Sequence, residues 1–544
     1  MACFGPVAPA EVEEESDPAE VAIGERLFRD PRFAEFFFSH SEGKINIPLI
    51  SGDPVLEKTH TINGTIPGIF AGQSMSCVAC HMVDDHLKTS GGGMRSYADF
   101  AARSPIPIRE DGKQFAPRNS PSLVNSTSSR DGNLFLHFDG EFSSIEELVQ
   151  GTLTGRNFGW LPTEKNIAIT HVADIIRKDD GSSLLAQQFG GLPYATLLKG
   201  TDRSISEDFR IPPEFRIDVY QSSNEQIVDG ISKLIGAYVK SLSFSQAETG
   251  EFNGSPYDLF LKKNGLPQTS NPGESNLDYS RRLLQEVLKL KNPQTVSSQD
   301  KTFQFHSQDF SFGALELKGM KIFFSEPSQK MLTSQEIATG GIGNCIACHA
   351  APLFTDFKFH NTGAAQAEFD DIHGAGAFSN LYIPSYAARS ANPALFLPPT
   401  SAHPDQVGTL LDIPNLSKPS HTDLGLWNVF ANDDIPSSQN SLLQTLCQEF
   451  KEEVSECHND QILPLTIAYF KTPSLRDLGH SAPFMHTGQM NTLESVAQHY
   501  LDFSKMARTG NFRNPSKEMK QIALNQNDLE ALVAFIQALN EDYQ

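Results

Sequence analysis

Two five-residue stretches, Cys77-Val78-Ala79-Cys80-His81 and Cys345-Ile346-Ala347-Cys348-His349, decide the fold of this chain. Each is a C-x-x-C-H sequence, which is the attachment signature of a c-type haem. The two thiols form thioethers with the porphyrin, and the adjacent imidazole, His81 or His349, reaches the iron as its proximal ligand. Two C-x-x-C pairs could instead hold one zinc ion with four thiolates, but zinc does not require a His directly after the second Cys. The sequence therefore predicts two covalently bound haem c groups.

The size and composition of the chain limit its class. Its 544 residues are too many for one ordinary core, so we expect more than one domain. A hydrophobic content of 39% and a charged content of 20% are typical of a soluble globular protein, and no apolar run is long enough to give a transmembrane segment. The formal charge of −23 argues against nucleic acid as a partner and suits a basic redox protein. The oligomeric state stays open, with a homodimer as one alternative.

Three cysteines lie outside the haem motifs. Cys447 and Cys457 stand close together in a polar stretch and predict a disulfide, although His458 leaves an aberrant third haem site as an alternative. Cys3 is either a lipid-anchor cysteine exposed by processing or an incidental thiol. Because c-type haem is attached outside the cytoplasm, we expect a periplasmic or secreted protein. Residues 1–16 lack the apolar core of a signal peptide, and we expect that this signal has been removed.

The chain contains the same module twice, as internal comparison shows. The matched pairs, first copy before second, are residues 24–31 with 319–327, Pro121-Ser122-Leu123 with Pro473-Ser474-Leu475, Asp139-Gly140 with Thr487-Gly488, and Ile145-Glu146 with Leu493-Glu494. The pairs occur in the same order around the two haem motifs, and the spacing from Gly140 to Ile145 equals that from Gly488 to Leu493, five residues. The chain is therefore expected to hold two copies of one haem-binding unit.

Each module closes with an amphipathic helix. Apolar residues follow a 3.6-residue stripe over 231–242 and again over 529–539, the second with Asn527 as N-cap and Glu530 at the capping-box position. These helices place the module ends near residues 245 and 544. The expected domains are 1–245 and 306–544, joined by a polar, turn-rich connecting segment over 246–305. Residues 364–440, rich in Gly, Ala, Pro and Ser, are expected as long loops over the second haem.

In both modules the chain resembles the bacterial di-haem cytochrome c peroxidase and MauG superfamily. Besides the haem motifs, the resemblance is carried by Leu27-Phe28-Arg29-Asp30-Pro31-Arg32, Arg118-Asn119-Ser120-Pro121-Ser122-Leu123-Val124-Asn125, Phe359-His360-Asn361-Thr362-Gly363, Thr422-Asp423-Leu424-Gly425, Lys471-Thr472-Pro473-Ser474-Leu475-Arg476 and Ala482-Pro483-Phe484-Met485-His486-Thr487-Gly488. It implies a mainly α protein of two cytochrome c-like haem domains, here with long irregular loops and insertions. The N-terminal haem then meets hydrogen peroxide, and the C-terminal haem relays electrons.

The resemblance also implies a calcium ion between the domains. Asn119 matches its side-chain ligand, and backbone carbonyls come from near Thr472. Carbonyl and amide oxygens suit this hard cation. A turn-capping role for Asn119 is the alternative.

The sixth iron ligands decide the chemistry, because a haem with two protein ligands passes electrons whereas a haem with one can bind peroxide or oxygen. Leu493, Val496 and Tyr500 share one helix face after Gly488. Tyr500 falls where the superfamily carries an axial Met or, in MauG-type enzymes, an axial Tyr, so we expect it to bind the second iron. The rival ligands are His499, Met506 and Met485, and an ordinary buried Tyr is the other alternative.

For the first haem, the position equivalent to Tyr500 is Thr152, which is a poor iron ligand. The peroxidases supply a distal His from the loop after the first haem motif, but residues 87–94 have Gly93 or Met94 there, and His86 precedes the match. We therefore expect an open first haem that needs no reductive activation. A sixth ligand from Met94 or His86 would leave an electron carrier instead.

Peroxide cleavage requires a group that moves a proton between the two oxygens. The superfamily uses a Glu past the Asp-Gly turn, and Glu164 matches it after an insertion is allowed, while Glu146 and Glu147 are expected to be solvated. Arg156 could stabilise a bound anion or lie on the surface. Phe138 stands where the superfamily has a Trp between the haems, and it has no indole to oxidise.

These features predict a di-haem oxidoreductase that reduces hydrogen peroxide at the haem held by His81. The haem held by His349 and Tyr500 would relay electrons from a small cytochrome c, a similar redox protein, or residues of a partner protein, as in MauG. The alternatives are a di-haem electron carrier without an open iron and a dioxygenase of the rubber-cleaving type.

Overall fold

The computed structural model describes residues 17–47, 60–61, 64–65, 76–81, 109, 111–113, 118–128, 132–301 and 309–541. Cys3, His86 and residues 87–94 lie outside these ranges. The described part of the chain is mostly helical, which confirms the mainly α class. Its strands form two short antiparallel pairs, β1 (His60–Thr61) with β2 (Gly64–Thr65) and β3 (Phe359–His360) with β4 (Phe470–Lys471). Within these ranges no helix combines the length and the apolar content needed to cross a bilayer.

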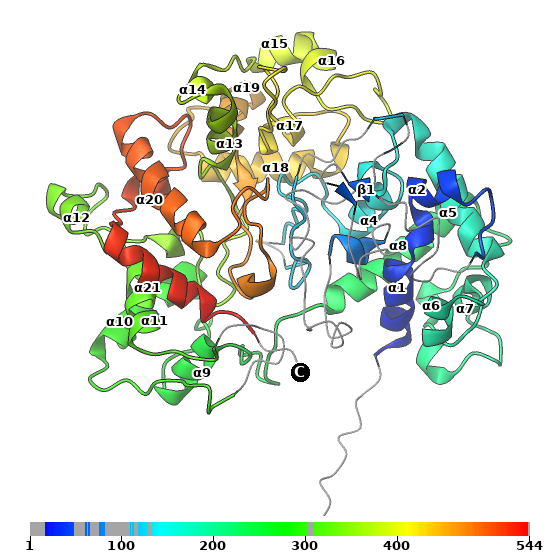
Figure 1. Cartoon of the computed structure of the whole chain (residues 1–544), viewed down its shortest axis with the longest axis horizontal. Helices are drawn as coiled ribbons and strands as arrows, with labels where there is room; N and C mark the ends of the chain where they lie inside the picture. The colour runs from blue at the N-terminus through cyan, green and yellow to red at the C-terminus, as the bar shows by residue number, and fades with distance from the viewer. Residues whose placement is uncertain are drawn as a thin grey trace, which may run out of the picture.

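The first module surrounds one apolar core, at the right of Figure 1. Its helices are α1 (Ala19–Arg29), α2 (Glu35–His40), α4 (Ile145–Leu153), α5 (Lys165–Lys178), α6 (Leu184–Gln188), α7 (Tyr194–Lys199) and α8 (Asn224–Ser241). Helix α1 packs directly against α8 at Gly24, where a Cβ atom would lie 2.8 Å from the carbonyl carbon of Leu234. The lack of a side chain at Gly24 therefore allows the two backbones to approach closely.

The second module repeats this helix crossing, at the left of Figure 1. Its helices are α9 (Pro256–Lys263), α10 (Asn276–Lys289), α11 (Ala314–Phe324), α12 (Ser334–Thr339), α20 (Leu493–Thr509) and α21 (Gln526–Gln537). Helix α11 packs against α21 at Gly319, where a Cβ atom would lie 2.6 Å from the carbonyl carbon of Ala531. Gly24 and Gly319, which begin the repeated sequence, thus occupy equivalent positions in the two cores.

The segment expected to connect the modules, 246–305, contributes to the second core. It forms α9 and α10, and Tyr257, Phe260, Tyr279 and Leu283 are buried there. Many polar residues in this segment lie on the outer faces of the two helices, because each helix buries only one stripe. In its packing, the segment is continuous with the second module.

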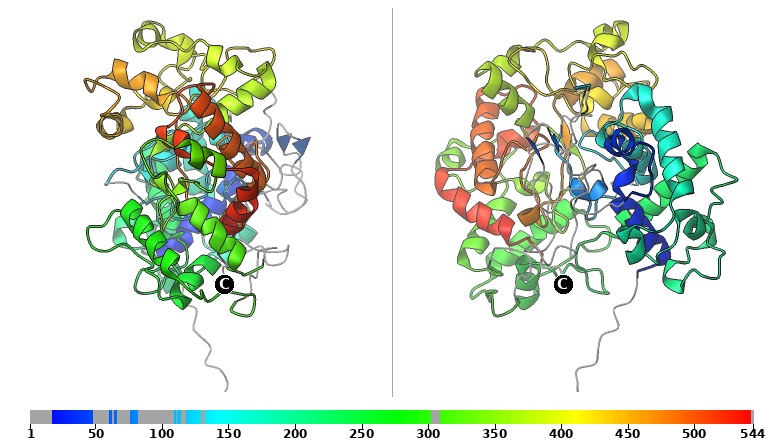
Figure 2. Two further views of the ribbon diagram at one scale, coloured as in Figure 1. Left: turned by 90° about the vertical axis from the view of Figure 1, so that its left-hand side faces the viewer. Right: turned by 45° about the vertical axis from the view of Figure 1, so that its right-hand side comes forward.

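Residues 359–470 build a third apolar core, at the top of Figure 1 and visible from two further sides in Figure 2. Its helices are α13 (Ala364–His373), α14 (Ala377–Asn380), α15 (Tyr386–Ala391), α16 (Pro393–Phe396), α17 (Leu426–Val429), α18 (Pro436–Glu449) and α19 (Asn459–Ile462). Strands β3 and β4 contribute Phe359 and Phe470 to this core. The expectation of long loops over 364–440 thus differs from the structure, because frequent Pro and Gly shorten the helices while Trp427 and Phe378 still supply a buried core.

Two local expectations have a clear outcome. Cys447 and Cys457 form the predicted disulfide, which excludes Cys457 from a third haem site. The N-cap of the last helix is Asn525, two residues before the expected Asn527. Asn525 caps α21 by accepting from the amide of Asn527, and Asp528, rather than Glu530, completes the capping box. The helix begins one turn earlier than its apolar stripe, because the first turn is polar.

Candidate active site

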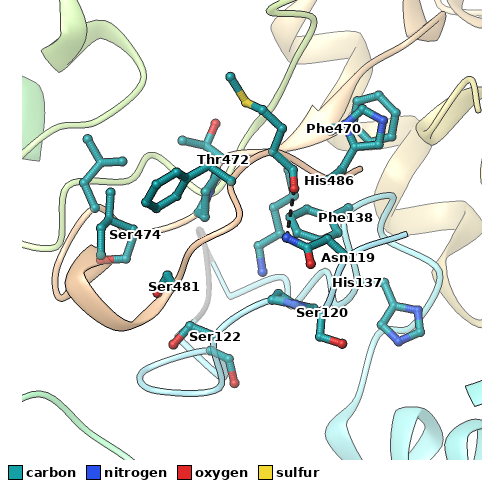
Figure 3. Close-up of a pocket in the computed structure, with 18 of the residues that line it drawn as sticks. Asn119, Ser120, Ser122, His137, Phe138, Phe470, Thr472, Ser474, Ser481 and His486 are labelled. Atoms are coloured by element: carbon teal, nitrogen blue, oxygen red, sulfur yellow. Dashed lines mark hydrogen bonds between the residues drawn. The ribbon is translucent and has the colours of Figure 1, made fainter. Parts of the chain in front are cut away.

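One continuous cavity, lined mainly by apolar side chains, lies between the two modules. Both haem motifs contribute to its wall through Cys77, Cys80, His81, Cys345, Cys348 and His349. The segments at its centre are 118–126 from the first module and 470–486 from the second, as Figure 3 shows. Residues far apart in sequence are thus brought to a single site.

The two haem motifs have the same local structure. Each begins with a short 3-10 turn, Cys77–Ala79 or Cys345–Ala347. The amide of His81 then donates to the carbonyl of Cys77 at 2.8 Å, and the amide of His349 donates to the carbonyl of Cys345 at 2.7 Å. This turn places both thiols and the imidazole of each motif on one side of the chain.

Both proximal imidazoles are oriented by backbone carbonyl groups. Nδ1 of His81 lies 3.0 Å from the carbonyl oxygen of Pro121, and Nδ1 of His349 lies 2.9 Å from that of Phe354. A hydrogen bond from Nδ1 leaves Nε2 available for a metal, which is the usual orientation of a ligating histidine. Burial lowers the pKa of each imidazole to about 4, so both are neutral at physiological pH, as an iron ligand must be.

The structure does not support the zinc alternative. None of the four motif cysteines takes part in a disulfide. Among the described residues, side chains that could ligate one metal gather in two groups, Cys348 with His360 and Glu518, and His137 with Asp139 and Glu141. Neither group joins the two C-x-x-C pairs, so a single four-thiolate zinc site is not formed.

The turn that leads into the ligand helix has the same backbone in both modules. In the first module Leu136 forms a β-bridge with Phe142, and in the second Phe484 forms one with Met490. Both bridges lie at the same distance in sequence before the helix that follows, α4 or α20. The residue that follows Leu136 or Phe484 has a left-handed backbone conformation, with φ of 63° at His137 and 70° at Met485. Position 152 on α4 is therefore structurally equivalent to position 500 on α20.

Helix α20 presents the expected face to the cavity. Leu493, Val496 and Tyr500 all line it. The imidazole of His499 instead bonds through Nε2 to the carbonyl of Thr362 at 2.8 Å, outside the cavity lining. Burial raises the pKa of the Tyr500 phenol, so the phenol keeps its proton unless a strong cation lies against its oxygen.

The other candidate iron ligands, and the equivalent helix of the first module, differ from Tyr500 in whether they line the cavity and can bind iron. Met506 does not line the cavity among the described residues, whereas Met485 does. On α4, Ile145, Val149 and Thr152 line the cavity. Thr152 therefore faces the cavity at the position equivalent to Tyr500. A threonine hydroxyl is not among the usual iron ligands of haem proteins.

Glu164 lies away from the described cavity wall. Its two carboxylate oxygens accept from Nη1 and Nη2 of Arg109, each at 2.9 Å, and one also accepts from the amide of Leu161. The insertion that the sequence match required moves Glu164 to the start of α5. Phe138 does line the cavity (Figure 3). Its carbonyl accepts from the amide of Lys471 at 2.7 Å.

A polar network at the cavity wall was not anticipated from the sequence. Nδ1 of His137 lies 3.1 Å from Oε2 of Glu141, and Nη2 of Arg156 donates to the same oxygen at 2.7 Å. His137 and Arg156 both line the cavity. The signal that could have revealed it is the four-residue spacing of His137 and Glu141 around the Asp-Gly turn.

A buried lysine also faces the cavity. Nζ of Lys471 donates to the carbonyl of Phe135 at 2.5 Å, and burial lowers its pKa to about 8. No carboxylate of a described residue pairs with this ammonium group among the ion pairs of the structure. The cavity thus contains a cationic group suited to an anionic substituent of a ligand.

Asn119 joins the two modules. Its Nδ2 donates to the carbonyl oxygens of Pro483 and Met485 at 2.7 and 3.1 Å, and its amide donates to that of His486 at 2.7 Å (Figure 3). Its Oδ1 is buried without a hydrogen-bond partner. The carbonyl of Thr472, also on the cavity wall, accepts from Oγ1 of Thr355. Asn119 is therefore more than a turn cap.

Arg118, next to Asn119, links the first module to the third core. Its guanidinium donates to Asp139 at 2.5 Å and, through two nitrogens, to both oxygens of Asp423 at 2.5 and 2.9 Å. All three side chains are buried. This bridge fixes the segment that carries Asn119 and Pro121, and hence the carbonyl that orients His81.

No family model matches the chain. The cytochrome-c peroxidase IdrP2 of Denitromonas iodatirespirans is 27% identical over 220 residues, which cover 38% of this chain and 40% of that protein. The methylamine utilization protein MauG of Methylorubrum extorquens is 40% identical over 75 residues, 13% of this chain and 19% of that protein. The matched parts therefore span less than half the length of these curated relatives. Even so, the matches confirm the resemblance to the di-haem cytochrome c peroxidase and MauG superfamily.

Solved structures give a weaker likeness. The di-haem peroxidase BthA of Burkholderia thailandensis aligns over 99% of this chain and 89% of its own, with 16% identity and a TM-score of 0.44. A MauG-like protein associated with microbial copper homeostasis aligns over 100% of this chain and 95% of its own, with 16% identity and a TM-score of 0.42.

Proposed function

We propose, from this resemblance, that the chain is a di-haem c-type oxidoreductase that reduces hydrogen peroxide. The observation that carries the proposal is the single cavity lined by both C-x-x-C-H motifs, with His81 and His349 each oriented by a backbone carbonyl. When bound, a haem with one protein ligand supplies an iron position for peroxide, and a haem with two supplies an electron relay. The chain's own residues decide which haem takes which part.

The two ligand helices differ at one equivalent position. Tyr500 on α20 would hold the second iron together with His349, and Met485 is its remaining rival on the cavity wall. Thr152 on α4 provides no ligand, so the described residues would leave the first iron with His81 alone. The first site is therefore the one proposed to bind peroxide, and the second the one proposed to relay electrons.

Other cavity residues would position the haems. Lys471 would hold a propionate carboxylate, because a buried ammonium group requires an anionic partner. Phe138 would fill the space between the haems, where the superfamily has a Trp. Because Phe138 cannot be oxidised, electrons would pass between the haems directly, without a stop on this side chain.

A calcium ion between the modules is part of the proposal. The buried Oδ1 of Asn119 has no hydrogen-bond partner, and a hard cation would satisfy it. The carbonyl of Thr472 is the second proposed ligand. Metal analysis of Asn119→Ala beside the unchanged protein tests this site, and equal calcium content in both would contradict it.

The electrons would come from a small redox protein such as a cytochrome c, or from residues of a partner protein. The formal charge of −23 suits a basic partner. A periplasmic or secreted location agrees with the Cys447–Cys457 disulfide, since disulfides persist in oxidising compartments.

The experiment that tests the function is EPR of the purified diferric protein, followed by mixing with hydrogen peroxide. One high-spin and one low-spin signal, with an immediate reaction, are expected. Tyr500→Phe should change the low-spin signal and leave the high-spin signal and the haem content unchanged. Two low-spin signals and no reaction would overturn the proposal and indicate an electron carrier.

A further inference from the structure

The network of His137, Glu141 and Arg156 has no part in attaching a haem, yet two of its members line the cavity. The side chains of His137 and Arg156 are 17% and 26% exposed, so part of each is accessible at the cavity wall. Both side chains contact the carboxylate of Glu141. The ring of His137 also packs edge-on against Phe142, with 5.0 Å between centroids. The imidazole is therefore fixed on two sides.

The hydrogen bond between His137 and Glu141 occupies one of the two ring nitrogens of His137. Glu141 takes Nδ1, and among the described residues Nε2 of His137 has no hydrogen-bond partner. Burial alone would raise the pKa of Glu141, but Arg156 and His137 hold it well below its usual range. An ionised carboxylate on Nδ1 keeps the proton there and leaves the lone pair on Nε2, which is the arrangement of a general base.

The second module shows that this network is specific to the first. At the turn positions equivalent to His137 and Glu141 it carries Met485 and Gln489, and the same residue count places Ser504, inside α20, where the first module has Arg156 beyond the end of α4. Gln489 donates to the carbonyl of Ala364, and Ser504 to that of Leu501. The second module thus has Tyr500 and no charged network, whereas the first has Thr152 and a complete one.

A metal ion is the other ligand that such a cluster could take, since His137, Asp139 and Glu141 lie close together. Asp139 already pairs with Arg118, and Glu141 already pairs with Arg156. These two guanidinium groups supply the positive charge that a metal would bring, and they would repel it. The cluster is therefore better suited to proton transfer.

We propose that His137 moves the proton between the two oxygens of hydrogen peroxide at the first haem, with Glu141 and Arg156 as its positioning residues. The inference rests on the proposed function and names the acid–base group of that site, for which Glu164 is the rival. With haem bound, Nε2 would take the proton from one oxygen of hydrogen peroxide and return it to the other as the O–O bond breaks. That oxygen then leaves as water and not as hydroxide.

The overall reaction balances with electrons that the proposed donor supplies. One hydrogen peroxide, two electrons delivered through the haems and two protons from solvent give two waters. His137 ends each cycle in the protonation state in which it began. Its contribution is to the rate of O–O cleavage, where a positioned acid–base group is worth about 10²- to 10⁴-fold.

The test uses the haem-loaded full chain and measures the second-order rate of its reaction with hydrogen peroxide. His137→Gln keeps a hydrogen-bonding side chain but cannot shuttle the proton, and it should slow the reaction by about 100-fold or more. The matched control is His421→Gln. His421 also pairs through Nδ1 with a carboxylate, Asp412, at 2.7 Å and is 15% exposed, but it does not line the cavity.

A second variant separates proton transfer from structural support. His137 has a left-handed φ of 63°, which glycine adopts without strain, so His137→Gly should fold and leave space for free imidazole. Added imidazole should restore much of the lost rate, and adding Glu141→Gln to this variant should abolish that rescue. Haem content and the EPR signals of the diferric protein should be unchanged in every variant.

Each outcome separates the inference from the proposed function. An unchanged protein that does not react with peroxide overturns the proposed function and, with it, this role. A reactive protein whose His137→Gln variant reacts within about threefold of it overturns the role alone. A slow His137→Gln variant without imidazole rescue of His137→Gly also overturns the role, because it indicates structural support. Slow reaction of Glu164→Gln in place of His137→Gln would assign the proton transfer to Glu164.

Discussion

Replacing Arg118 with Met should destabilise the protein more than any surface change, because it leaves two carboxylates buried without a counter-charge. The side chains of Arg118, Asp139 and Asp423 are 9%, 1% and 3% exposed. Arg118 binds Asp423 through two nitrogens, a geometry that favours both strength and orientation. Removing one partner of a buried ion pair costs about 3–5 kcal/mol, and the remaining acids would have to take up protons.

The measurement is urea unfolding of the haem-loaded protein at neutral pH, followed by circular dichroism. Arg118→Met should lower the free energy of unfolding by about 3–5 kcal/mol. A triple variant that also carries Asp139→Asn and Asp423→Asn removes the buried charges, so it should regain most of this loss. A single variant within about 1 kcal/mol of the unchanged protein, or a triple variant no better than the single, would refute the reasoning.

The same bridge predicts a dependence on pH. Burial raises the pKa of Asp423, but Arg118 reverses this, and the folded pKa lies below the usual value. A lowered pKa of an acid contributes stability above the unfolded pKa of about 4, and that stability is lost as the pH falls through the folded value. In Arg118→Met the carboxyl protonates instead, so the difference between the two proteins should shrink below about pH 4.

Two further predictions concern the helix crossing at Gly319 and the buried acid Glu541. Gly319→Ala should lower the melting temperature, because the new Cβ would overlap the carbonyl of Ala531, and overpacking of about 1–3 kcal/mol exceeds the helix propensity gained. Gly230→Ala, where the nearest atom is a flexible Ile side-chain end at 3.2 Å, is the control and should change little. Burial raises the pKa of Glu541 to about 8, against the lowering effect of Arg476, so the folded state binds a proton that the unfolded chain has released. Stability should therefore fall between about pH 4.5 and 8 by up to about 1.4 kcal/mol per pH unit, and melting curves of Glu541→Gln should lose this slope; parallel slopes in both proteins would contradict it.

What could be predicted from the sequence was whatever a local pattern requires. Haem attachment needs two thiols and an imidazole within five residues, and a close helix crossing needs a small residue at one point. The haem motifs were therefore predictable, and the stretches that begin at Gly24 and Gly319 were recognised as a repeat, although not as the points of two helix crossings. The disulfide was readable for a similar reason, since Cys447 and Cys457 are close in sequence.

What could not be predicted depends on contacts between distant segments. Arg118 and Asp423 are 305 residues apart, so nothing near either one indicates the bridge. The third core was missed because its helices are short and interrupted by Pro and Gly, and such helices are stabilised by packing and not by their own periodicity. The contact of Arg109 with both carboxylate oxygens of Glu164 also joins segments 55 residues apart, and a role of Glu164 in peroxide cleavage stays a prediction.

Because the two modules share the same backbone around their haem motifs, the side chains at equivalent positions can be compared directly. Both modules place a left-handed residue, a glycine turn and a capped helix at equivalent points, yet the side chains that face the cavity differ. A residue able to bind iron, Tyr500, occurs where the polar network is missing, and the network occurs where the equivalent residue is Thr152, which supplies no ligand to the open iron of the proposed function. A closed iron has no use for a proton-transfer group, because no substrate reaches it, whereas an open iron requires one. The paired differences at positions 152 and 500, and at 137 and 485, therefore favour one reactive site and one relay over two equivalent haems.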